Sequence, residues 1–267
     1  KGMQGQKKLS FSALALSVWT AALAESLEPG VSLRGMLLYG GLGALLLTGI
    51  SAVLCVCWQQ TAVRQVWLFA AVLGLLAEAF RTAMQAQSVC QQEFHSMALL
   101  GLLPLLLWAG CRIPLSGWDA PARVLWWFVL LGEGLCLAGI AGQMERSHLL
   151  EPDAVQLARL PCVPLYAEYL LWPLLIEEPA PRRVLFLPWL TFLAQVCLAG
   201  GICLVFGGTD YPEQELLRAW SVSIFSRMDA LLLLIWLTCA VFRIGFLCAA
   251  AGELWKKATN RRKGAAG

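Results

Sequence analysis

Long apolar runs alternate with short polar segments along most of this chain. A helix needs about 20 apolar residues to cross the hydrocarbon core of a bilayer. By that measure the runs predict about eight membrane-spanning helices, one of which is interrupted by prolines. The predicted spans are residues 9–27, 35–58, 66–88, 97–113, 122–143, 157–176, 184–206 and 229–252.

The composition indicates a chain that is surrounded mainly by lipid. Of its 267 residues, 59% are hydrophobic and 14% are charged, and the mean hydropathy is +0.68. A soluble domain has about 25% charged residues, so this chain has too few polar side chains to cover a water-facing surface. We therefore expect an all-α, polytopic membrane helix bundle at residues 1–252, followed by a basic cytoplasmic tail at residues 253–267.

The distribution of basic residues predicts an orientation in the membrane. If the N-terminus is cytoplasmic, most Lys and Arg residues fall on inside segments, as the positive-inside rule requires. Eight spans then place the basic C-terminal tail inside as well, in an integral membrane protein. The net charge is only +3. Because the basic residues are spread over loops and tails, the sequence argues against a nucleic-acid-binding protein.

The sequence contains little that points to an enzyme. Most of the ten cysteines lie inside apolar runs, where cysteine behaves as a small buried hydrophobe. No cysteine spacing resembles a zinc ribbon or a CxxC redox pair. The two histidines are far apart in sequence, and HExxH, GxSxG and phosphate-binding glycine loops are absent from the sequence. We therefore expect neither catalysis nor a bound metal or cofactor.

Four ionisable residues fall inside predicted spans: Glu78, Glu133, Glu168 and Arg243. A charge at the centre of a bilayer costs about 2.5–3.5 kcal/mol even on lenient scales, so each residue is a functional candidate by default. Structural roles are the alternative. Glu78 could pair with Arg81, Glu133 could be a protonated packing residue between two glycines, and Arg243 could pair with a carboxylate across the bundle.

The segment VPLYAEYLLWPLLIEEPAPRR places Glu168 between Pro164 and Pro173. Each proline removes a backbone donor, and carbonyls freed in this way are tolerated in a membrane only where protein or water satisfies them. A broken helix with a carboxylate at the break is typical of binding sites in secondary transporters. A proline-kinked structural helix is the alternative. The predicted small-molecule site consists of Pro164, Tyr166, Ala167 and Glu168, with Glu133 or Glu78 nearby.

The segment at residues 209–252, beginning TDYPEQELLRAWS, resembles the endospore germination permease family, the membrane B subunits of spore germinant receptors. That family has a Tyr-Pro loop, a Glu-Leu-x-Arg step and an Arg-x-Asp/Glu-Ala pair before an Ile-Trp helix. Upstream, PLYAEYLLWPLL is similar to the family's Phe-Gly-Glu helix, with Ala167 and Glu168 at its Gly-Glu. The matching residues are Tyr211, Pro212, Glu215, Leu216, Arg218, Ser221, Phe225, Arg227, Asp229, Ala230, Ile235 and Trp236, and Arg243 stands where the family often has a lysine.

The resemblance has implications for fold and function. The family belongs to the amino acid/polyamine/organocation transporter superfamily, so it implies a LeuT-like inverted-repeat bundle, here truncated from ten helices to eight. It also implies a transporter-like receptor subunit of the spore inner membrane. Such a subunit would bind an amino acid or similar germinant at a broken sixth helix. Its partners would be a large membrane subunit with a soluble domain and a lipoprotein. Arg218, Arg227, Asp229 and Arg243 would have structural or gating roles. A non-binding membrane scaffold is the alternative.

Overall fold

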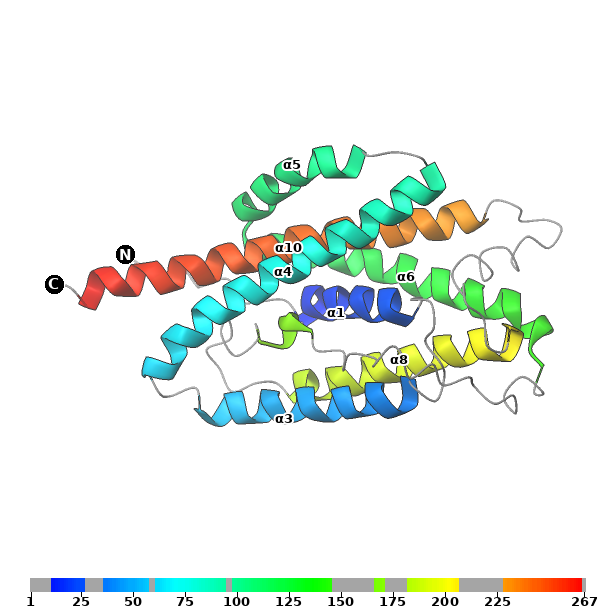
Figure 1. The fold of residues 1–267 in the computed structure, drawn as a ribbon, viewed down its shortest axis with the longest axis horizontal. Helices are drawn as coiled ribbons and strands as arrows, with labels where there is room; N and C mark the ends of the chain where they lie inside the picture. The colour runs from blue at the N-terminus through cyan, green and yellow to red at the C-terminus, as the bar shows by residue number, and fades with distance from the viewer. Residues whose placement is uncertain are drawn as a thin grey trace.

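The computed structural model describes residues 11–26, 36–57, 61–94, 98–145, 166–170, 182–206 and 228–265. Within these ranges the chain forms helices and no strand, which confirms the expected all-α class (Figure 1). The long helices are α1 (Phe11–Ser26), α3 (Gly41–Cys57), α4 (Thr61–Phe94), α5 (Ala98–Arg112), α6 (Asp119–Ile140), α8 (Arg182–Phe206) and α10 (Met228–Ala265). The short ones are η1 (Met36–Gly40), η2 (Leu115–Trp118), η3 (Ala141–Gln143) and η5 (Ala167–Leu170).

The predicted spans coincide with described helices, with the exception of the span at 157–176. There only residues 166–170 are described, and they form the single turn η5. Within the described ranges, three helical segments are long and apolar enough to cross a membrane: Trp67–Gln91, Leu185–Val205 and Leu232–Thr259. Phe11–Leu23 and Leu37–Val53 are shorter apolar helices. These lengths and compositions are compatible with a membrane protein.

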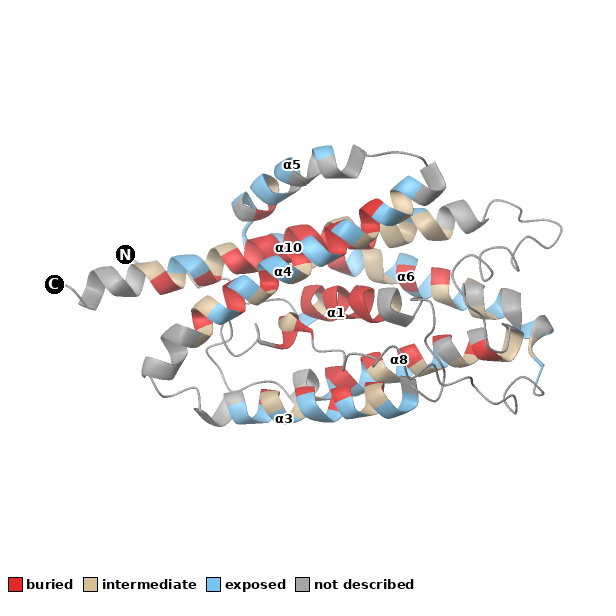
Figure 2. Cartoon of the chain, in the orientation of Figure 1, coloured by how far each residue is buried: buried red, intermediate tan, exposed pale blue. Residues whose placement is uncertain are grey.

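Helix α10 is the centre of the arrangement. It packs most extensively against α4, which crosses it, and it also contacts α5, α1 and α6 (Figure 1). Helix α1 lies inside the bundle, and α3 and α8 run side by side along the opposite edge from α5. Every side chain of α1 from Ala13 to Ala22 is buried (Figure 2). A helix that is apolar on all sides, as α1 is, is stable only when it is enclosed.

The outer faces of the bundle carry large apolar side chains. Trp127 of α6 is 77% exposed, Leu73 of α4 is 70% exposed and Phe186 of α8 is 68% exposed. Other exposed leucine, phenylalanine and tryptophan residues lie on the same outward sides of these helices and of α3. A soluble monomer rarely exposes so much contiguous apolar surface, whereas such surface is what lipid contact requires.

Glycines set the closest helix approaches to α10. Gly132 in α6 lies against Leu232 and Ile235 of α10, whereas a Cβ at Gly134, on the other side of Glu133, would have nothing within 4 Å. Gly110 of α5 lies directly against the backbone of Gly245 in α10, and the Trp118 ring covers Gly245. Small residues let helix backbones approach each other in membranes, where dispersion replaces the hydrophobic effect as the driving force.

Helix α10 continues through the expected boundary between bundle and tail. It runs without interruption from Met228 to Ala265, and Leu254 and Ala258, beyond residue 252, are still buried. The basic segment therefore begins as a helical extension of α10 that packs on the bundle.

Candidate functional site

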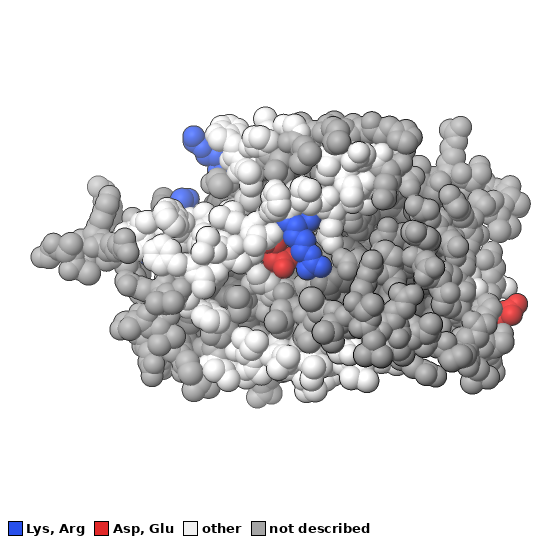
Figure 3. Space-filling model, viewed as in Figure 1, with Lys and Arg blue, Asp and Glu red and all other residues white. Residues whose placement is uncertain are grey.

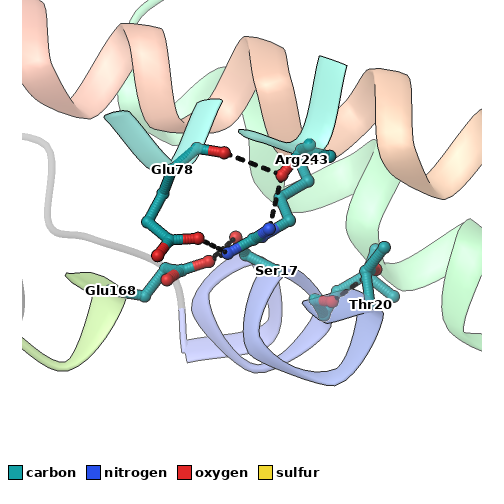
Figure 4. Close-up of polar contacts among 7 residues, drawn as sticks. Ser17, Thr20, Glu78, Glu168 and Arg243 are labelled. Atoms are coloured by element: carbon teal, nitrogen blue, oxygen red, sulfur yellow. Dashed lines mark hydrogen bonds and ion pairs between the residues drawn. The ribbon is translucent and has the colours of Figure 1, made fainter. Parts of the chain in front are cut away.

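A buried ion-pair cluster lies where α1, α4, α10 and η5 meet (Figure 4). Its centre is Arg243 of α10, whose side chain is 2% exposed. Arg243 Nε donates to Glu168 Oε1 at 2.8 Å and Arg243 Nη2 donates to Glu78 Oε2 at 3.1 Å. Arg243 Nη1 donates to the hydroxyl of Thr82. The structure thus confirms that Arg243 pairs with carboxylates across the bundle.

Glu168 occupies the short turn η5. The N–H of Tyr169 donates to the carbonyl of Tyr166 at 3.1 Å, which closes a single 3₁₀ turn with Glu168 inside it. The Glu168 side chain is completely buried, and its Oε1 also accepts a hydrogen bond from Ser17 Oγ at 3.0 Å. Its Oε2 is buried without a hydrogen-bond partner anywhere among the residues that the structure describes. Glu168 therefore faces protein and not lipid or bulk water.

Glu78 and Thr82 reach the cluster from one face of α4. They are four residues apart, so they lie one above the other on the helix, and Thr82 Oγ1 donates to the Glu78 carbonyl at 2.9 Å. The Glu78 side chain is 17% exposed, so it connects the buried cluster to the surface of α4. The predicted partner of Glu78 was Arg81 on the same helix, whereas the ion pair found here joins Glu78 to Arg243 across the bundle.

The cluster places two carboxylates on one guanidinium in a site closed to solvent. Removing an ion from water costs several kcal/mol, and this cost is offset only by good geometry and additional hydrogen bonds. Glu168 Oε1 meets these conditions, because it accepts hydrogen bonds from Arg243 and from Ser17. Glu168 Oε2 does not, because it is buried and accepts no hydrogen bond from the described residues. Glu168 Oε2 is therefore a buried acceptor that is still able to bind a donor.

The tyrosines of η5 face away from the ion pair, toward α8. Gln195 Nε2 donates to Tyr166 Oη at 2.9 Å and to the carbonyl of Ala22 at 3.2 Å. The Tyr169 hydroxyl lies 3.5 Å from Thr191 Oγ1. These bonds connect Tyr166 and Tyr169 to α8, and Gln195 also connects α8 to α1.

Ala167 faces α4, where a Cβ added to Gly74 would lie 3.6 Å from the Ala167 methyl group. A small residue at each position lets the turn and the helix approach closely.

Glu133 does not contact this cluster. Its Oε1 accepts a hydrogen bond from Trp19 Nε1 of α1, and the Trp19 ring packs edge-on against Trp126 at 5.4 Å. Ser17 and Trp19 are two residues apart and so point to different sides of α1. The predicted residues Glu78 and Glu168 are therefore brought together, whereas Glu133 lies on another side of α1 in a polar contact of its own.

Some residues of the site were not predicted. Ser17, Thr82 and Gln195 all contact the predicted residues directly, and all are buried. A weak signal exists for Ser17 and Gln195, which are polar side chains within apolar runs. Such residues are also common on helix surfaces, so the sequence could not single them out.

Other predicted residues lie outside the described part of the chain. These are Pro164, Arg218 and Arg227, together with the side chain of Asp229, whose backbone begins α10. Within the described residues, no group of three or more His, Cys, Asp or Glu side chains could hold a metal ion.

The described part of the chain is a helical bundle with three candidate membrane-spanning helices and a buried Glu–Arg–Glu cluster at a single-turn helix. Comparison of the chain with protein-family models, curated proteins and solved structures yielded no match.

Proposed function

We propose that this chain is a transporter-like membrane subunit of a spore germinant receptor, with a truncated LeuT-like architecture of about eight spans. In this proposal it binds an amino acid or similar small molecule beside η5 and passes the event to partner subunits. The resemblance of residues 160–252 to the germination permeases motivates the receptor role. The observation that carries the binding role is the free, fully buried Oε2 of Glu168 next to Arg243.

The cluster suits a ligand that carries both charges. An amino acid has an ammonium group, which a carboxylate binds, and a carboxylate, which a guanidinium binds in a two-pronged geometry. Glu168 and Arg243 are opposite charges 2.8 Å apart, and they satisfy each other in the closed arrangement. A zwitterion that entered between them would replace one internal ion pair with two external ones, so little charge would be left unpaired.

A non-binding scaffold is the second candidate, and it too has a specific observation in its favour. Glu168 Oε1 already has two donors, from Arg243 and Ser17, and the three helices that supply the cluster are tightly packed. Such a cluster would fix the relative positions of α1, α4 and α10 without any ligand. The two candidates make different predictions for binding.

The test is binding of the common amino acids to the purified chain in lipid nanodiscs, followed as a shift in thermal unfolding. Stabilisation by at least one amino acid, lost in Glu168→Gln, supports the binding role. Glu253→Gln is the matched control, because Glu253 is a surface residue of α10 paired with Lys256 and lies away from the cluster. That variant should respond to the amino acid as the parent does.

The receptor role and the binding role are separable in this design. An absence of stabilisation by any amino acid, in a parent chain that still captures a large membrane subunit and a lipoprotein, establishes the scaffold. Should Glu168→Gln fail to fold, Ser17→Ala removes one donor to the same carboxylate and should weaken binding while keeping the ion pair.

A further inference from the structure

The second half of α4 carries a row of polar side chains that leads to the buried cluster. Glu78, Arg81, Gln85 and Ser88 are spaced by three and four residues, so they follow one another along one face of the helix. Arg81 and Ser88 are exposed, and Glu78 and Gln85 are partly exposed. In Figure 3, acidic and basic atoms meet near the centre of the visible face, where α4 crosses α10.

This polar row borders the apolar outer surface of the same helix. Phe80 is 60% exposed and Met84 is 47% exposed, in line with Leu73 and Leu76. Met84 is three residues from Arg81 and four from Ser88, so the exposed side of the row adjoins this surface, whereas Gln85 is rotated from Met84 by about 100°. Helix α4 therefore has an outer surface suited to lipid, and the polar row runs along its edge, between that surface and the buried cluster.

The polar row ends at the cluster. On the N-terminal side of Glu78 the same face continues with Gly74, Ala70 and Trp67, which carry no charge. Gly74 is the point where α4 contacts Ala167 of η5. Thr82, on the buried side of the row, accepts a hydrogen bond from Arg243. Glu78 forms an ion pair with the same arginine. Glu78 lies near the middle of the candidate span Trp67–Gln91, so the row covers only the C-terminal half of that span.

We propose that Ser88, Gln85 and Arg81 line an aqueous entry route from the C-terminal end of α4 to the Glu78–Arg243–Glu168 cluster. Exposed charged and amide side chains within a span are tolerated where they line a water-filled path, and are costly against lipid. The alternation of polar groups along the route suits a small polar solute, and the route ends where the free Glu168 Oε2 is located. The route gives the proposed amino-acid site its entrance, and in that sense it rests on the proposed function.

Cysteine labelling tests the route without any ligand. Gln85→Cys and Met84→Cys are made in the full chain, reconstituted in lipid nanodiscs, and treated with a charged, water-soluble methanethiosulfonate. Modification at each position is followed by peptide mass spectrometry, with the parent chain as the background for its native cysteines. The two positions differ by about 1.5 Å in depth and by about 100° around the helix, so they form a matched pair.

Gln85→Cys is expected to react on the order of tenfold or more faster than Met84→Cys, because only a thiol in contact with water forms the reactive thiolate. Slow reaction at both positions would overturn the route. Equally fast reaction at both would also overturn it, since the whole α4 surface would then be in water. Ser88→Cys, which replaces oxygen with sulfur, provides the same measurement if Gln85→Cys does not fold. Labelling and amino-acid binding are independent readouts, so a failure of one is distinguishable from a failure of the other.

Discussion

Arg243 Nε and Glu168 Oε1 are 2.8 Å apart, although 75 residues separate them in the chain, and both side chains are almost completely buried. The contact joins the central helix α10 to the isolated turn η5. Since η5 is a single 3₁₀ turn, its position depends on contacts with the surrounding helices such as this one.

The first prediction concerns this ion pair. Arg243→Met should destabilise the bundle by about 3–5 kcal/mol, because it leaves Glu168 and Glu78 buried without a cation. Glu168→Gln should cost less, about 1–3 kcal/mol, because Arg243 keeps its ion pair with Glu78. The double variant should cost clearly less than the sum of the two, since it removes both charges. Thermal or denaturant unfolding in detergent measures all three, and strictly additive losses would show that the two residues do not interact.

The second prediction concerns Glu133. Its contact with the Trp19 indole N–H needs an acceptor and does not need a charge. Glu133→Gln should therefore change the free energy of unfolding by less than about 1 kcal/mol, whereas Glu133→Leu leaves the indole N–H without its acceptor and should cost about 1–3 kcal/mol. Unfolding of the two variants side by side is the measurement. Equal losses in both would indicate that the negative charge of Glu133 is itself required.

The third prediction compares two glycines of α5. A Cβ at Gly110 would lie 2.8 Å from the Gly245 carbonyl oxygen, so Gly110→Ala should force α5 away from α10 and cost about 1–3 kcal/mol. Gly101 has nothing within 4 Å of such a Cβ. Gly101→Ala should therefore be neutral or stabilise the helix by about 0.5–1 kcal/mol. Thermal unfolding of the matched pair decides the point, and similar stabilities would mean that α5 and α10 do not approach as closely as described.

Much of the helical framework could be predicted from the sequence. Apolar runs of the length of a helix predicted α1, α3, α4, α5, α6, α8 and α10, because a chain with so few polar residues must satisfy its backbone within helices. The end of α10 was harder to predict. Leu254 and Ala258 are buried contacts within a stretch that also contains lysines, and charge dominates any estimate made from composition.

The candidate site was predictable only in part. Glu78, Glu168 and Arg243 were conspicuous because a charge in an apolar run is costly unless something compensates it. The contacts that join these three residues were not predictable. For Glu78, the nearby Arg81 was a more obvious partner than Arg243, which is distant in sequence. Ser17 gave only a weak signal and Thr82 gave none, since hydroxyl side chains in helices usually bond their own backbone.

By itself the sequence determined the chemical character of this protein: a helical chain suited to lipid, with a small number of charges placed where they must be paired. That follows from local physics, because the cost of burying an apolar or charged group depends mainly on the group itself. Only the tertiary structure decided which charges meet, that Glu133 is attached to a different side of α1 from Glu168, and that one oxygen of Glu168 is left free. Those outcomes depend on how helices distant in sequence are rotated and packed against one another, and a rotation of one residue around a helix axis is enough to change the partner.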